Sequence, residues 1–233
     1  MCAVDACRDL AAVPYPLARP ADLDRVVASL GDRGLGVTAD ARHLGELAAA
    51  VSATVERFGR LDAVVAAHGV IAGGPPAWQT DEATWQVMLD VNLTGVWNVA
   101  RATVGALLEA PAPRQGRFVA VSSAAGVRGL PQLAAYSAAK HGVVGLVTSM
   151  AAELGPAGVT ANVVCPGSTA TAILDASAAV YGLASPEEFA QHHLLPRLIT
   201  PDEVASAIAF LCGPGGSAIT GAVIPVDAGM GAK

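Results

Sequence analysis

The chain has 233 residues and carries 14 Lys and Arg side chains against 20 Asp and Glu side chains, so its formal net charge is −6. This acidic balance gives no electrostatic footprint for a nucleic-acid backbone, and we expect neither DNA nor RNA as a partner. An apolar content of 53% over this length supplies a sizeable core and excludes intrinsic disorder. No apolar run reaches the roughly 18 residues of a membrane-spanning helix. Residues 1–20 lack a secretory signal, so we expect a cytoplasmic protein without a membrane partner.

The cysteine and histidine patterns predict neither a disulfide framework nor a metal site. The cysteines are scattered and form no CxxC pair, which indicates reduced thiols. The neighbours His192 and His193 point to different sides of any regular element, so they do not form a metal site. The four cysteines are Cys2, Cys7, Cys165 and Cys212.

Short, mostly apolar runs alternate with longer segments of helical periodicity. Buried strands are predicted at residues 63–67, 117–122, 159–165 and 222–226. Helices are predicted at residues 21–30, 42–58, 81–108, 134–154 and 201–211. This alternation predicts an α/β fold, a doubly wound parallel sheet of the Rossmann type with helices on both faces. No linker or repeat divides the chain, so residues 1–233 are expected to form one domain.

The start of the chain resembles the end of a buried strand, with Asp5 at its carboxyl tip. In a Rossmann-type unit the acid that binds the adenosine ribose lies about 20 residues after a glycine-rich phosphate loop. Here that loop, its strand and its helix would fall before Met1, so we expect the first strand–helix unit to be missing from the given chain. Residues 31–36 contain three glycines but link a helix to a strand, so we interpret them as a helix cap and turn.

The strongest chemical pattern consists of Ser123, Tyr136 and Lys140. Tyr136 and Lys140 are four residues apart in a predicted helix and therefore share one face. A nearby ammonium favours phenolate, so we expect Lys140 to lower the pKa of Tyr136 from its usual value of about 10. Ser123 follows a predicted strand, where its hydroxyl can hold a substrate oxygen while charge develops. Such a tyrosine can exchange a proton with an alcohol or a carbonyl.

These residues and several other segments resemble the short-chain dehydrogenase/reductase family over nearly the whole chain. Within that family, residues 4–9, 15–18 and 194–197 are most similar to the mycofactocin-linked, carveol-dehydrogenase-like members. The segments that carry the family resemblance are NLTG at 92–95, VSSAAG at 121–126, Pro131, YSAAK at 136–140, PGSTAT at 166–171, ITG at 219–221 and PVDAG at 225–229.

The resemblance implies an NAD-dependent oxidoreductase that interconverts a hydrophobic secondary alcohol and its ketone by hydride transfer. Tyr136 would be the catalytic acid/base, Ser123 would polarise the substrate oxygen, and Lys140 would also hold the nicotinamide ribose. Asn92 would anchor a water in a proton relay. The implied cofactor-binding residues are Asp5, Asp40 and Ala41 at the adenosine end, Ala67 and Gly69, Tyr136 and Lys140, and Gly167, Thr169 and Thr171 toward the nicotinamide.

The acid at the ribose position favours NAD over NADP. A carboxylate at Asp5 hydrogen-bonds ribose hydroxyls and repels a 2′-phosphate, although Arg8, three residues later, weakens this inference slightly. The chain departs from the family pattern at Ala67-His68-Gly69, where Asn-Ala-Gly is usual. His68 is either a compensating hydrogen-bonding group, a ring near the adenosine, or a locally satisfied histidine.

Three further expectations concern substrate, rival functions and assembly. Residues 172–200 are rich in apolar side chains and are expected to form the substrate loop. The rivals to the dehydrogenase are a truncated non-catalytic subunit or a misassigned start, either of which lacks the phosphate loop and cannot bind a dinucleotide tightly, and a lyase or epimerase on the same scaffold. Two predicted helical segments, 96–107 and 141–152, are apolar or small around most of their circumference, which predicts a homo-oligomer, either a dimer or a tetramer.

Overall fold

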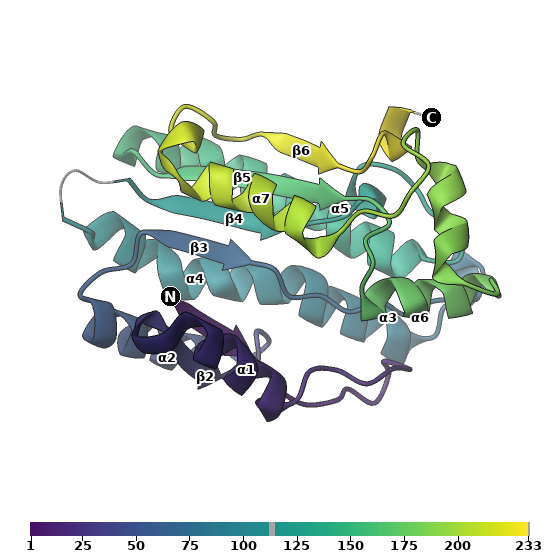
Figure 1. The fold of residues 1–233 in the computed structure, drawn as a ribbon, viewed down its shortest axis with the longest axis horizontal. Coiled ribbons are helices and arrows are strands. Elements are labelled where there is room, and N and C mark those ends of the chain that lie inside the picture. The colour runs from purple at the N-terminus through teal and green to yellow at the C-terminus, as the bar shows by residue number, and fades with distance from the viewer. Residues whose placement is uncertain (112–114, 233) are drawn as a thin grey trace.

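The computed structural model describes residues 1–111 and 115–232, in which six parallel strands form two sheets (Figure 1). Strands β1 (Cys2–Asp5) and β2 (Leu35–Thr38) form a two-stranded ladder. The other sheet has the order β3-β4-β5-β6. Its strands are β3 (Ala63–Ala66), β4 (Arg117–Val121), β5 (Thr160–Pro166) and β6 (Val223–Val226). Within each sheet the strands are parallel, so the carboxyl ends of its strands lie at one edge.

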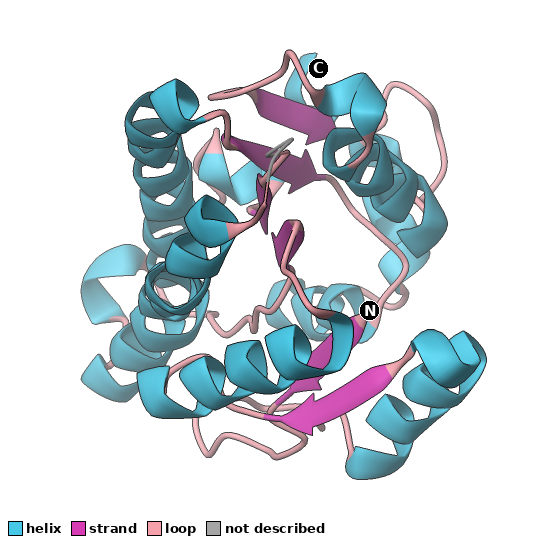
Figure 2. Ribbon diagram, turned by 90° about the vertical axis from the view of Figure 1, so that its left-hand side faces the viewer, coloured by secondary structure: helices cyan, strands magenta, loops and turns pink. Residues whose placement is uncertain are grey.

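Seven α-helices in the described part of the chain cover the sheets (Figure 2). They are α1 (Pro20–Leu30), α2 (Leu44–Phe58), α3 (Glu82–Leu89), α4 (Gly95–Glu109), α5 (Ala134–Leu154), α6 (Ala172–Tyr181) and α7 (Pro201–Cys212).

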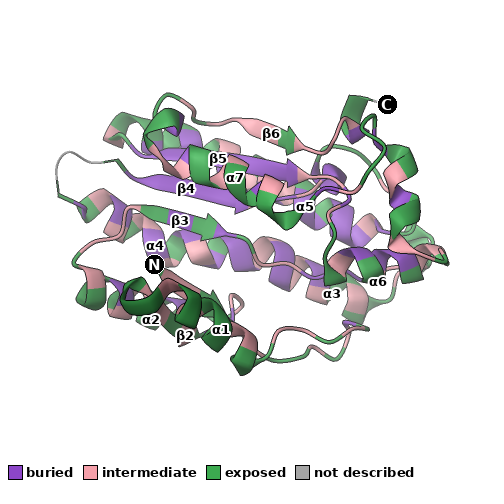
Figure 3. Ribbon diagram, in the orientation of Figure 1, coloured by how far each residue is buried: buried purple, intermediate pink, exposed green. Residues whose placement is uncertain are grey.

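The two central strands of the four-stranded sheet, β4 and β5, are buried on both faces, whereas alternate residues of β3 are exposed (Figure 3). Along β4, Phe118 and Ala120 join the core formed with α4 and α5, whereas Val119 packs with α7 residues such as Leu211. Alternate side chains of a strand point to opposite faces, so a strand covered on both sides needs a continuous apolar run. The predicted α/β class with helices on both faces is therefore confirmed.

The segment predicted as a helix at 81–108 is helical without a gap from Glu82 to Glu109, but it is not α-helical throughout. A π-helical turn, Asp90–Thr94, lies between α3 and α4. Inside it the Asn92 side chain donates to the carbonyl oxygens of Met88 and Val70, each at 3.0 Å. The turn is thus held from outside the helix, and such π-bulges are frequent at functional sites.

The two sheets are joined through helices. No ladder between β1 and β3 occurs among the described residues, and α2 packs against α4 to connect the two parts. The predicted helix from residue 42 begins later, at Leu44, because Arg42 turns its side chain back to Asp40. None of the helices in the ranges given above is long and apolar enough to cross a membrane.

Candidate active site

Ser123, Tyr136 and Lys140 meet at the carboxyl edge of the four-stranded sheet. Ser123 lies two residues beyond β4, and its Oγ accepts a hydrogen bond from the N–H of Ala125 at 3.1 Å. Tyr136 and Lys140 lie in the first two turns of α5, and Lys140 Nζ is 5.7 Å from the centre of the Tyr136 ring. The Ser123 hydroxyl is close enough to the Tyr136 phenol to act on its pKa. The structure therefore brings together the three residues that the sequence grouped.

Two contacts fix α5 against the end of β4. Lys140 Nζ donates to the carbonyl oxygen of Val121 at 3.0 Å, and Ser122 Oγ donates to the carbonyl oxygen of Lys140 at 2.9 Å. Gly126 makes this close approach possible, since a Cβ there would lie 2.2 Å from Ser122 Oγ and 2.8 Å from the Lys140 carbonyl oxygen. The position of the Lys140 ammonium is set by the backbone around it.

The pKa of Tyr136 is not lowered, which corrects the expectation from the sequence. Burial raises the pKa of Tyr136 to about 12, and the nearby Ser123 hydroxyl only partly opposes this. Burial also lowers the pKa of Lys140 to about 8. Burial removes both groups from water and so disfavours their charged forms. This effect outweighs the attraction between the Lys140 ammonium and a Tyr136 phenolate, although Lys140 Nζ is only 5.7 Å from the centre of the tyrosine ring.

Asn92 is fully buried beside the catalytic group and its side chain is used structurally. Its Oδ1 accepts the N–H of Val70 at 3.0 Å, while Nδ2 serves Val70 and Met88 as described above. Gly69 lies between Asn92 and Lys140, because a Cβ at Gly69 would be 3.0 Å from Asn92 Oδ1 and 3.2 Å from Lys140 Nζ. The Asn92 carboxamide is therefore engaged by the backbone of Val70 and Met88.

An apolar cluster surrounds Tyr136. Tyr15 comes from the loop between β1 and α1, close enough to raise the pKa of Tyr136, and its hydroxyl accepts the N–H of Ile71 at 3.0 Å. The sequence analysis used Tyr15 only as part of the segment 15–18 that carries the resemblance, and it assigned Tyr15 no role. The cluster contains Val13, Val70, Ile71, Ala72, Met88, Val91, Ala125, Leu133, Ala135 and Tyr136.

The segment after β5 is pinned by a histidine that the sequence left unassigned. His193 Nε2 accepts the N–H of Ser168 at 3.2 Å, and its Nδ1 bonds the carbonyl oxygen of Arg197 at 2.7 Å. Thr169 pairs with Ile199 as an isolated parallel bridge. The predicted substrate loop is therefore tied directly to the segment containing Gly167, Thr169 and Thr171.

The adenosine-end residues predicted from the sequence lie at the carboxyl edge of the smaller sheet. Asp5 and Thr38 are paired, and the N–H of Ala39 donates to the Asp5 carbonyl oxygen at 3.0 Å. Asp40 follows directly, and Ala41 lies next to Gly95, where an added Cβ would be 3.1 Å from the Ala41 Cβ. The negative charges of Asp5 and Asp40 act to raise the pKa of His68, and the positive charge of Lys140 acts to lower it. His68 therefore interacts electrostatically with both this edge and Lys140.

His68 is half-buried, and one of its ring nitrogens has no hydrogen-bond partner. That nitrogen, Nε2, has none among residues 1–111 and 115–232, and a Cβ at Gly95 would lie only 2.7 Å from it. Burial lowers the pKa of His68 to about 4 and the charge of Lys140 adds to the shift, while the backbone of Val91 acts in the opposite direction.

The donor set at this edge fits the two nucleoside ends of a dinucleotide. Asp5 can accept from ribose hydroxyls, the Lys140 ammonium can donate to them, and the unpartnered His68 Nε2 lies between the two. The given sequence contains no glycine-rich turn from a strand into a helix that could bind the diphosphate of such a dinucleotide. Among the described residues, no group of three or more His, Cys, Asp or Glu side chains could hold a metal ion.

Comparison with known proteins assigns the chain to a family. Residues 9–231 match the family described as enoyl-(acyl carrier protein) reductase. The fold and the Ser-Tyr-Lys site are those of short-chain dehydrogenases/reductases, and the chain belongs to that family. The family resemblance drawn from the sequence and its class, an oxidoreductase, are confirmed.

Three relatives indicate the branch of the family. The chain is 37% identical over 245 residues to a (−)-trans-carveol dehydrogenase of Rhodococcus erythropolis, covering 99% of this chain and 87% of the relative. It is 36% identical over 242 residues to an uncharacterized NAD-dependent oxidoreductase of Mycobacterium tuberculosis, covering 97% of this chain and 85% of the relative. A crystal structure of carveol dehydrogenase from Mycobacterium avium in complex with NAD superposes with a TM-score of 0.93 at 32% identity, covering 100% and 88% of the two chains.

Proposed function

We propose that the chain is an NAD-dependent oxidoreductase that interconverts a hydrophobic secondary alcohol and its ketone. The observation that carries the proposal is the meeting of Ser123, Tyr136 and Lys140 within an apolar cluster at the carboxyl edge of the sheet. An apolar lining around a few convergent polar groups is typical of a site for a small hydrophobic molecule. Relatives named for carveol, a hydrophobic secondary alcohol, support this substrate class.

Tyr136 moves the proton of the substrate oxygen. With a pKa of about 12 its phenol is protonated at neutral pH, and this form can donate a proton from Oη to the oxygen of a ketone that is being reduced. The Ser123 hydroxyl donates a hydrogen bond to the same oxygen while negative charge develops on it. NAD supplies the hydride acceptor or donor when it is bound.

Lys140 and the adenosine-end residues would hold the cofactor. The Lys140 ammonium is fixed by Val121 and placed to donate to the nicotinamide ribose, while Asp5 would accept from the adenosine ribose. Thr169 and Thr171 lie on the segment that His193 pins and would contact the nicotinamide end. The adenine would lie against Ala41, and Ala67 and Gly69 would line the path between the two ribose positions.

The test compares the wild type with Tyr136→Phe in NADH-dependent reduction of hydrophobic ketones, with carvone, the ketone of carveol, as the first probe. We expect a loss of activity of about 10²- to 10⁴-fold. Unchanged circular dichroism and unchanged NAD affinity in the variant would show that only the titrating oxygen was removed. Retention of most of the turnover would overturn the proposal.

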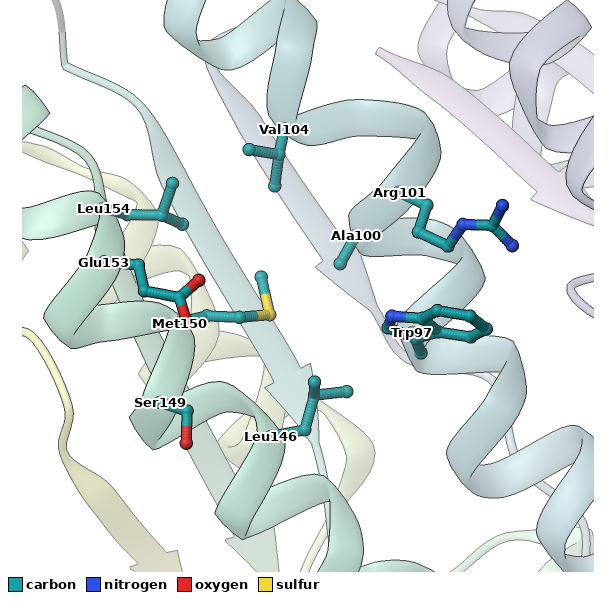
Figure 4. A pocket seen from close by; sticks show the side chains of 9 residues that line it. All are labelled: Trp97, Ala100, Arg101, Val104, Leu146, Ser149, Met150, Glu153 and Leu154. Carbon is teal, nitrogen blue, oxygen red and sulfur yellow. The ribbon is translucent and has the colours of Figure 1, made fainter.

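We also propose that α4 and α5 form the contact between two copies of the chain. Their outer faces line a groove of about 300 Å³, in which Ala100 and Val104 of α4 point toward α5 while the Arg101 and Trp97 side chains extend away from it (Figure 4). Trp97 is 48% exposed, and the Arg101 guanidinium stacks on its ring, with Cζ 4.5 Å from the ring centre. A large exposed aromatic side chain beside an apolar groove is typical of an interface.

A further inference from the structure

Asp40 binds two arginine side chains at once. Its Oδ2 accepts from Arg8 Nη2 and from Arg42 Nη2, each at 2.7 Å, and its Oδ1 accepts from Arg42 Nε at 3.1 Å. The Arg42 backbone N–H adds a further bond to Oδ1 at 2.9 Å. The Asp40 side chain is only 7% exposed. Because these bonds occupy most of the acceptor positions of the Asp40 carboxylate, it has little room to accept a hydrogen bond from a ligand. Asp40 can therefore affect a bound cofactor through the positions of the two arginine side chains.

The two arginines are held with different strength. Arg42 makes several bonds to Asp40 and also lies in the field of Asp90 and Glu46. Arg8 makes a single bond to Asp40, and its side chain is 49% exposed. Arg8 is therefore the guanidinium that a change at Asp40 would release.

Arg8 and Asp5 share one short turn. The Asp5 carboxylate accepts the N–H of Cys7 at 2.7 Å, and Cys7 has a left-handed φ of 51°. This turn sends the Arg8 side chain across to Asp40, two residues beyond the partner of Asp5 in the β1–β2 ladder. The guanidinium is thus directed toward the loop after β2 and held there.

We propose that Asp40 is a positioning residue for cofactor selectivity, which holds Arg8 away from the ribose position beside Asp5. This inference rests on the proposed NAD-dependent function. An arginine near that position accommodates the 2′-phosphate of NADP, whereas an acid binds the ribose hydroxyls of NAD. With Arg8 bound to Asp40, the acid alone faces the ribose. The chain therefore contains the cation needed for NADP and keeps it engaged elsewhere.

Asp40 stays ionised, and so stays bound to Arg8, throughout the physiological pH range. Burial raises the pKa of the Asp40 carboxyl, but the hydrogen bonds from Arg42 and Arg8 outweigh this and hold it well below its usual range. Glu46 is the other acid within electrostatic reach of Arg8, but its oxygens bind the N–H of Asp40 at 2.7 Å and His43 Nδ1 at 3.0 Å. A released Arg8 therefore finds no free carboxylate on this loop except Asp5.

The test measures binding and needs no turnover. Adenosine and adenosine 2′-phosphate are titrated by ligand-detected NMR into the wild type, Asp40→Asn, Arg8→Gln and the double variant. We expect the affinity for adenosine 2′-phosphate, divided by that for adenosine, to rise about tenfold in Asp40→Asn. One new charge-assisted hydrogen bond from Arg8 to the phosphate accounts for a change of this size. Arg8→Gln alone should keep the wild-type ratio, and the double variant should return to it. The ratio cancels any general weakening at the adenine end.

Asp9→Asn is the matched control, since it removes an acid of the same loop that pairs with Arg19 and not with Arg8. Its ratio should equal that of the wild type. An unchanged ratio in Asp40→Asn, a raised ratio in the double variant, or a lowered one in Arg8→Gln overturns the inference while leaving the proposed function intact. Failure of adenosine to bind any folded variant overturns the cofactor site itself and this inference with it.

Discussion

His193 and Ser168 are joined by a hydrogen bond in which the histidine is the acceptor, at 3.2 Å. Because Nε2 accepts, the proton of the neutral ring is on Nδ1, which donates to the carbonyl oxygen of Arg197. His193 is 2% exposed, so both backbone groups depend on it. One imidazole thus links the proposed nicotinamide segment to the proposed substrate loop.

His193→Phe keeps a ring of similar size but leaves the Ser168 N–H and the Arg197 carbonyl unpaired. We expect a loss of about 2–4 kcal/mol in the free energy of unfolding, measured by urea denaturation, because each orphaned buried group costs about 1–3 kcal/mol. His192→Phe is the matched control, as the neighbouring ring is exposed and should change stability by less than about 0.5 kcal/mol. Equal effects at the two positions would contradict the linking role.

The lowered pKa of His68 predicts a pH dependence of stability. Between about 4, the folded pKa, and 6.5, its ordinary value, the unfolded state binds more protons at this residue than the folded state. Stability from His68 is therefore fully present above pH 6.5 and is lost as the pH falls toward 4. We expect the free energy of unfolding to fall by about 2 kcal/mol across this pH window. This is less than the full pKa shift implies, because the ring is only partly enclosed.

Urea unfolding of the wild type and His68→Gln at several pH values in this window measures the effect. Glutamine keeps a polar side chain but does not titrate, so the difference between the two proteins should shrink as the pH falls. A difference that stays constant with pH would show that His68 does not titrate with a shifted pKa.

Gly126→Ala tests the close approach of α5 to the end of β4. The added methyl group meets Ser122 Oγ and the Lys140 carbonyl oxygen at distances far below contact, so α5 must shift. We expect a loss of about 1–3 kcal/mol in stability, as for other overpacked sites. Gly129→Ala, where no atom lies within 4 Å of the new Cβ, is the control and should be nearly neutral.

Trp97→Glu tests the proposed interface between copies. A charge placed beside Glu153 in the groove would meet a second copy of itself across a two-fold axis, so the assembly should dissociate in sedimentation velocity at micromolar concentration. Trp78, which is 84% exposed and far along the chain from the groove, supplies the control Trp78→Glu. A wild-type protein that sediments as a monomer would remove the proposed interface.

The candidate catalytic group could be proposed from the sequence because part of its geometry is local. Tyr136 and Lys140 are four residues apart in one helix and therefore share a face, Ser123 follows an apolar strand, and the family resemblance implied the roles of all three. The burial that raises the pKa of Tyr136 was not predictable, since it depends on packing from Tyr15 and the apolar cluster around it.

The residues that the sequence analysis left without a role act over long separations. His193 bonds Ser168 across 25 residues, and Tyr15 bonds Ile71 across 56. The π-helical turn depends on Asn92 reaching Val70, 22 residues away. Such contacts leave no periodic pattern in the sequence, because they depend on which loops the fold brings together.

The division of the strands into two sheets gives the molecule two units of unequal size. The β1–β2 pair bears α1 and connects to the rest through α2 against α4, with no ladder to β3 in the described part of the chain. Amide hydrogens of this pair should exchange with solvent through an opening that leaves β4 and β5 protected. Asp5 and Asp40 lie in the smaller unit and Tyr136 in the larger, so the proposed ribose site and the proposed proton-transfer residue belong to different units. The contact of α2 with α4 and the hydrogen bond from Ile71 to Tyr15 hold these units together.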